Sequence, residues 1–186
     1  MSGAATATTL VVTGSVTFLV GAAVGVPRVF TEPDPATKLR MLEERLTWWR
    51  AAQPLYAVGP LVAAVGIGFL AGSVDAGSER AWFGLSCPLL LVGAACWSRS
   101  VYLRFRHVRE FAFGELPGWP FAAYVWLTLA GLAVLGTGLL TVGFPAWAGW
   151  LTLAATLTFL VGYVRFGDIP PFVFYLLLPV VSTGWS

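Results

Sequence analysis

Long runs without a charged residue constrain this chain more than any other feature. Such runs cover residues 1–27, 51–74, 81–98, 116–164 and 169–186. An ionised side chain at the centre of a bilayer costs several kcal/mol, so the charged segments mark boundaries between membrane spans. The composition agrees: with 58% hydrophobic and only 11% charged residues, too little polar surface would remain to cover a soluble domain. The sequence therefore predicts an integral membrane protein.

The lengths of the uncharged runs predict the number of spans. The fourth run holds 49 residues, about twice what one helix needs to cross a hydrocarbon core of about 30 Å. We place its break at residues 143–145, where the sequence is Gly-Phe-Pro. We predict an all-α, polytopic transmembrane helix bundle forming a single domain over residues 1–186. Its six spans are expected near 7–27, 53–73, 81–100, 120–141, 146–164 and 170–185. The alternative is a five-span bundle in which the short last segment only half inserts.

Basic residues are concentrated in alternate loops. The predicted loops on the other side of the membrane contain one basic residue, Arg80. Under the positive-inside rule the basic loops face the cytoplasm, so we expect a cell-membrane protein with both termini outside. The first loop carries Arg28, Lys38, Arg40, Arg45 and Arg50. The third loop carries Arg99, Arg104, Arg106 and Arg109, and the fifth carries Arg165.

The first loop also contains a predicted helix near residues 36–50. Leu39, Leu42, Leu46 and Trp49 recur there at helical spacing, with charged residues on the other faces. This pattern is typical of a helix that lies along the membrane interface. Tryptophans near the predicted span ends are typical of an interfacial aromatic belt: Trp48, Trp49, Trp82, Trp119, Trp147 and Trp185. Two glycine pairs, at 21 and 25 and at 68 and 72, have the small-xxx-small spacing that allows close helix packing.

Several kinds of chemistry lack the residues they need. The single histidine, His107, lies in a loop, which excludes a bis-histidine haem and argues against zinc or di-iron sites built on several histidines. The sequence has no carboxylate cluster for a divalent metal, no P-loop and no nucleophile elbow. A formal charge of +2 gives no global basic field for nucleic acid. We therefore expect no metal, no cofactor and no nucleic-acid partner, and we identify no catalytic residue.

The candidate ligand-binding residues are few. Arg99, Arg104, Arg106 and Arg109 extend the third span and can bind anionic lipid headgroups or a phosphorylated ligand. The alternative is that they only determine topology. Because this loop and the first loop are close in chain order, we expect them to meet as a cationic floor beneath the helices.

Three further side chains complete the candidate site. Trp97 and Trp126 do not suit the aromatic belt and are candidates for the wall of a ligand chamber. Asp168 precedes the last span, where it can cap that helix. Alternatively it pairs with Arg165 or with third-loop arginines, or relays protons.

Three classes of function are open. A non-enzymatic component of a membrane complex is favoured, because the spans contain no ionisable residue of the kind that marks an ion or proton path. The alternatives are a small transporter or lipid-handling protein, and an intramembrane enzyme acting on an apolar lipid or isoprenoid. Expected partners are membrane lipids, anionic headgroups among them, and a protein partner or second copy of the chain. The enzyme class would need an acid at the interface, from among Glu32, Asp34, Glu43, Glu44, Glu110, Glu115 and Asp168.

Overall fold

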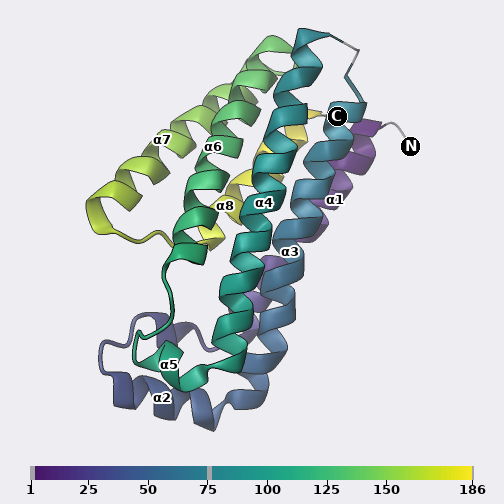
Figure 1. Ribbon diagram of the computed structural model, residues 1–186. Helices are drawn as coiled ribbons and strands as arrows, with labels where there is room; N and C mark the ends of the chain where they lie inside the picture. The colour runs from purple at the N-terminus through teal and green to yellow at the C-terminus, as the bar shows by residue number, and fades with distance from the viewer. Residues whose placement is uncertain (1–2, 75–76, 186) are drawn as a thin grey trace.

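The computed structural model describes residues 3–74 and 77–185, which form a bundle of helices without a strand among them (Figure 1). Within these ranges five helices are long and apolar enough to cross a membrane. They are α1 (Gly3–Val24), α3 (Leu46–Gly72), α4 (Ser78–Arg106), α6 (Trp119–Thr141) and α7 (Ala146–Phe166). A shorter apolar helix, α8 (Phe172–Ser182), continues into the 3₁₀ turn η2 (Thr183–Trp185). The predicted all-α, multi-pass membrane bundle is confirmed.

The bundle has two distinct ends. The 3₁₀ turn η1 (Pro27–Phe30) and the short helices α2 (Pro35–Glu44) and α5 (Val108–Ala112) lie at one end, which we call the loop end. The chain begins and finishes at the opposite end, which we call the terminal end (Figure 1). The elements therefore alternate in direction as the loop pattern of the sequence requires.

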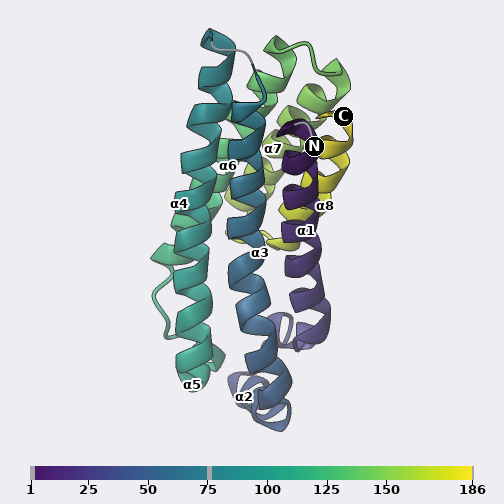
Figure 2. The ribbon, with the colours of Figure 1, turned by 90° about the vertical axis from the view of Figure 1, so that its right-hand side faces the viewer.

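The last apolar segment is shorter than the predicted span of residues 170–185. Helix α7 ends at Phe166 and is capped by Gly167, whose φ of +70° lies in the left-handed region that favours glycine. Pro170 and Pro171 then follow, and a proline disfavours helical backbone in the residue before it. Helix α8 therefore begins only at Phe172. It starts partway along the bundle and runs to the terminal end (Figures 1 and 2).

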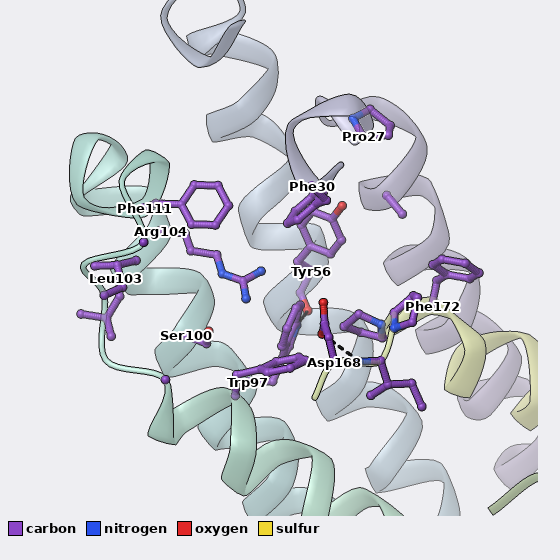
Figure 3. Close-up of a pocket in the computed structure, with 18 of the residues that line it drawn as sticks. Pro27, Phe30, Tyr56, Trp97, Ser100, Leu103, Arg104, Phe111, Asp168 and Phe172 are labelled. Atoms are coloured by element: carbon purple, nitrogen blue, oxygen red, sulfur yellow. Dashed lines mark hydrogen bonds between the residues drawn. The ribbon is translucent and has the colours of Figure 1, made fainter. Parts of the chain in front are cut away.

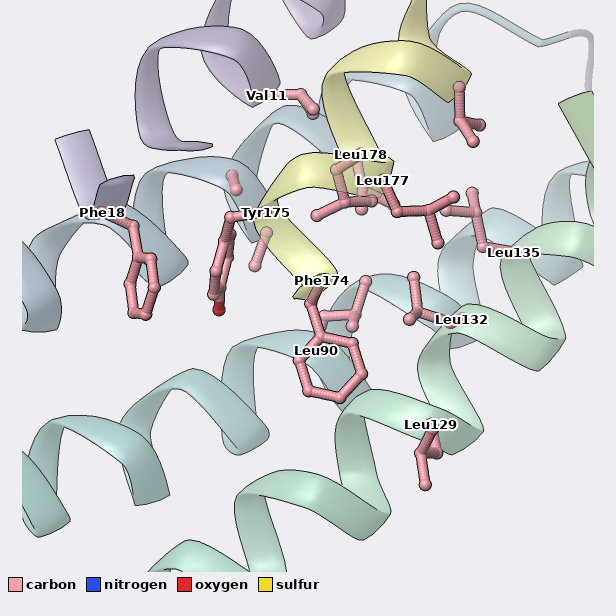
Figure 4. Packing of buried hydrophobic residues seen from close by; sticks show 14 of the residues in the cluster. Val11, Phe18, Leu90, Leu129, Leu132, Leu135, Phe174, Tyr175, Leu177 and Leu178 are labelled. Carbon is pink, nitrogen blue, oxygen red and sulfur yellow. The ribbon is translucent and has the colours of Figure 1, made fainter. Parts of the chain in front are cut away.

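Helix α8 fills the centre of the bundle near the terminal end. Its Phe174, Tyr175 and Leu178 pack among buried side chains of α1, α4 and α6 (Figure 4). The ring of Tyr175 lies 4.2 Å from that of Phe18 in α1, measured between centroids. Because α8 covers only part of the bundle's length, no helix of the described residues fills the centre of the half nearer the loop end.

The loop end has its own small core. Helix α2 packs against α5, and Val26, Val29, Leu42, Trp49 and Ala112 form a buried cluster between them and the ends of the spans. The prediction that the first and third loops meet is confirmed. The prediction that Trp49 belongs to an aromatic belt is wrong, because its side chain is fully buried, and the same holds for Trp185.

The predicted interfacial helix of residues 36–50 is divided in two. Asp34 caps α2 by accepting a 2.8 Å hydrogen bond from the backbone N–H of Thr37. Hydrogen bonds from the side chain and backbone of Thr37 lower the pKa of Asp34 below its usual value. Helix α2 ends at Glu44, because Arg45 adopts a non-helical backbone (φ −124°, ψ 29°). The chain then turns, and residues from Leu46 onward belong to the spanning helix α3.

Candidate ligand-binding cavity

A cavity of about 820 Å³ occupies the space beneath the N-terminal end of α8 (Figure 3). Its size is within the range of small-molecule and cofactor pockets, about 300–1,000 Å³. Its walls come from α1, η1, α2, α3, α4, α5, the start of α6 and the connection between α7 and α8. The cavity is thus a consequence of the short last helix, which leaves the centre of the bundle open toward the loop end.

Arg104 is the principal charged group of the cavity wall. Figure 3 shows its guanidinium extending from α4 into the cavity. The guanidinium carbon lies 5.1 Å from the ring centroid of Trp97 and 5.4 Å from that of Phe111. A third ring, Phe30, lies at 5.8 Å. These distances suit cation–π attraction, so aromatic rings replace part of the water that would surround a free guanidinium.

The local backbone explains how Phe111 reaches Arg104. Helix α4 ends at Arg106, and His107 has φ −122° and ψ 64°, which interrupts the helix. The chain turns there, and α5 brings Phe111 back over the last turns of α4. Trp49 stacks on Phe111, with the ring centroids 5.2 Å apart, and its indole N–H donates to the carbonyl of Arg104 at 3.4 Å.

Trp97 is held in place by a hydrogen bond to a carbonyl that a proline leaves without a helical donor. Pro60 lacks a backbone N–H, so the carbonyl of Tyr56 four residues earlier has no helical donor. The indole N–H of Trp97 donates to this carbonyl at 2.8 Å. The bond satisfies a buried acceptor and fixes the wide face of the indole as a cavity wall.

Asp168 lines the cavity from the connection between α7 and α8 (Figure 3). Its Oδ1 accepts a 2.7 Å hydrogen bond from the adjacent backbone N–H of Ile169. The prediction that Asp168 caps the last helix is wrong, because α8 begins after Pro171. Nor does it form a salt bridge with Arg104 or Arg165: within the described ranges, the one salt bridge joins His107 and Glu110. Arg104 and Asp168 thus line the same cavity without a salt bridge between them.

A second cation borders the same cavity. Lys38 of α2 also lines it, and its ammonium lies 5.6 Å from the ring centroid of Phe111. Lys38 comes from the loop end, whereas the deeper wall is aromatic, with Phe18, Tyr56 and Trp97 all buried. The cavity therefore combines cations with a mainly apolar wall.

The structure separates the seven residues that the sequence singled out. Trp97, Arg104 and Asp168 line this cavity. Arg99, Arg106 and Arg109 are exposed and do not line it, so the third-loop arginines point in different directions rather than forming one cluster. Trp126 is 52% exposed and packs edge-on against Tyr163, away from the cavity.

Most residues that line the cavity were not predicted as site residues from the sequence. Phe30, Lys38, Tyr56 and Phe111 come from four different elements, and only tertiary packing brings them to Arg104. Lys38 offered one signal, since it is the only lysine of the chain. Pro60 offered another for Tyr56, because a proline inside a span frees the carbonyl four residues before it.

Most of the acids that the sequence offered do not line the cavity. Of the acids that an interfacial enzyme would need, Asp168 lines it, whereas Glu32, Asp34, Glu43, Glu44, Glu110 and Glu115 are absent from its described wall. In the part of the chain that the structure describes, no three His, Cys, Asp or Glu side chains lie together as metal ligands. No protein-family model, curated protein or solved structure matches this chain.

Proposed function

We propose that this membrane protein is a lipid-handling protein that binds an amphipathic ligand with an anionic head in the cavity beneath α8. The observation that carries the proposal is the environment of Arg104. Its guanidinium faces a large, mostly apolar cavity and is flanked by three aromatic rings, and no carboxylate of the described residues forms a salt bridge with it. A charge held in this way gains most from an anionic ligand, and the planar guanidinium suits two hydrogen bonds to a phosphate or carboxylate.

The apolar wall of the cavity supports the proposal that the ligand also has an apolar part. Phe18, Tyr56 and Trp97 line the cavity on the side toward α8 and the bundle core. Burying hydrocarbon against such a wall contributes roughly 0.8 kcal/mol per CH₂ group. A ligand with a charged head and an apolar tail would satisfy Arg104 and this wall together, whereas a small inorganic anion would use only the first.

The test compares two neighbouring arginines. Arg104→Gln removes the charge from the cavity, and Arg106→Gln removes an equal charge from an exposed side chain that does not line it. The full chain is purified in mild detergent with a defined mixture of anionic phospholipids, and the bound lipid is counted by native mass spectrometry. We expect Arg104→Gln to lower the affinity for lipid roughly tenfold, because a charge-assisted hydrogen bond is lost. Arg106→Gln should match the wild type.

Equal retention in the wild type and in Arg104→Gln would contradict the proposal, provided both proteins remain monodisperse and helical. Loss of lipid in both variants would instead assign retention to the general basic surface of the loop end. Lipid retention by that surface should then fall steeply as the salt concentration rises, because salt screens exposed charges.

A further inference from the structure

Resting on the proposed function, we infer that the cavity selects a zwitterionic head that carries both a phosphate ester and a primary ammonium group. Arg104 and Asp168 present opposite charges to one cavity, yet they form no salt bridge with each other. An anion alone would satisfy Arg104 and leave Asp168 facing the ligand with a like charge. A head with both charges would pair its phosphate with Arg104 and its ammonium with Asp168.

The surroundings of Asp168 favour a hydrogen-bond donor. Oδ1 of its carboxylate accepts a hydrogen bond from the backbone N–H of Ile169. The next two residues are Pro170 and Pro171, which also line the cavity and have no backbone N–H to offer. A carboxylate has about four acceptor positions, so most of them are open to further donors, and a primary ammonium supplies three. A quaternary ammonium supplies none.

The position of the two charges also suits such a head. Arg104 comes from the last turn of α4, whereas Asp168 comes from the connection above the cavity, where α8 begins. An ionised side chain near the middle of a membrane protein is costly unless it faces a partner or a polar cavity. Asp168 is exposed and Arg104 is partly buried at this cavity, and a ligand that bridges them would replace the solvent there.

The test of this inference compares two variants, each of which removes the charge of one carboxylate. Asp168→Asn removes the negative charge but keeps an oxygen to accept from Ile169. Glu115→Gln makes the same change on an exposed residue of the connection between α5 and α6, outside the cavity wall. Each protein is offered equal amounts of phosphatidylethanolamine and phosphatidylglycerol with identical acyl chains, and bound lipids are resolved by native mass spectrometry. A parallel arm offers water-soluble glycerophosphoethanolamine in place of the lipid.

We expect the wild type and Glu115→Gln to prefer the ethanolamine head, and Asp168→Asn to lose that preference by roughly tenfold. Competition by the soluble compound would identify the free head as sufficient, whereas its failure to compete would identify the lipid as the ligand. Unchanged preference in Asp168→Asn would overturn this inference while Arg104-dependent binding persists. Absence of Arg104-dependent binding in the first place would overturn the proposed function instead. Circular dichroism and gel filtration establish that each variant is folded.

Discussion

At the scale of single residues, glycine decides how closely α1 and α3 approach. A Cβ atom built on Gly59 would lie 2.6 Å from the carbonyl oxygen of Gly14, and one on Gly14 would lie 2.5 Å from the carbonyl oxygen of Gly59. The two backbones therefore touch at this crossing. Close backbone approach allows van der Waals contact between helices in a membrane, where the hydrophobic effect does not drive association.

Gly59→Ala should consequently destabilise the protein. The added methyl group must push α1 and α3 apart, and overpacking of this kind costs about 1–3 kcal/mol. Gly162→Ala in α7 is the control, because a Cβ there meets nothing within 4 Å. Unfolding by a denaturing detergent, followed by circular dichroism, should show the first variant unfolding earlier and the second within about 0.5 kcal/mol of the wild type. Equal stabilities would mean that the helices can separate here at little cost.

The glycine pattern in the sequence identified only part of this packing. Gly21, in the predicted pair at 21 and 25, does lie against Leu55 and Ala52 of α3, whereas a Cβ at Gly72 would meet open space. Spacing defines a face of a helix but not which helix covers that face. The pair that brings α1 and α3 into contact, Gly14 and Gly59, lies on two separate helices, so no spacing within one helix could reveal it.

At the scale of elements, Trp49 joins the loop-end helices to the spans. It is fully buried at the start of α3, stacks on Phe111 of α5 and donates to the carbonyl of Arg104 in α4. Trp48, its neighbour, is 61% exposed. Successive residues of a helix point about 100° apart, so one of two adjacent tryptophans can be buried while the other faces outward.

Trp49→Ala should therefore loosen the whole loop end. Removing a fully buried tryptophan costs about 3–5 kcal/mol, and the segments held by it, α2 and α5, should exchange their amide hydrogens faster. Trp48→Ala should leave exchange in both helices unchanged. Hydrogen exchange measured by mass spectrometry tests this. If protection of α5 is the same in the two variants, Trp49 does not hold the loop end together.

The elements themselves followed from sequence more readily than their ends did. Charge-free runs located the five long helices because the cost of burying a charge is large and local. The break at Arg45 and the late start of α8 depend on competition between backbone conformations, which differ by much less energy. The cavity could not be predicted for the same reason: it exists because α8 is short, and its aromatic wall is assembled from elements far apart in the chain.

At the scale of the whole molecule, the distribution of charge relates the bundle to its membrane. Nine of the eleven basic residues lie between residues 28 and 50 or between 99 and 109, in or beside the elements of the loop end. The link between α3 and α4 at the terminal end is followed by a single arginine, Arg80. The positive-inside rule predicts that the loop end faces the cytoplasm, which would present the cavity to the inner leaflet.

Two cysteine variants test this orientation. Gly77→Cys places a thiol at the terminal end, where a side chain meets open space, and Glu115→Cys places one at an exposed site between α5 and α6. The native Cys87 and Cys96 are first replaced by alanine. In intact cells a membrane-impermeant maleimide should label Gly77→Cys directly and Glu115→Cys only after the membrane is permeabilised. The reverse pattern would invert the bundle and direct the cavity toward the outer leaflet, and labelling of both thiols from one side would contradict their placement at opposite ends of the spans.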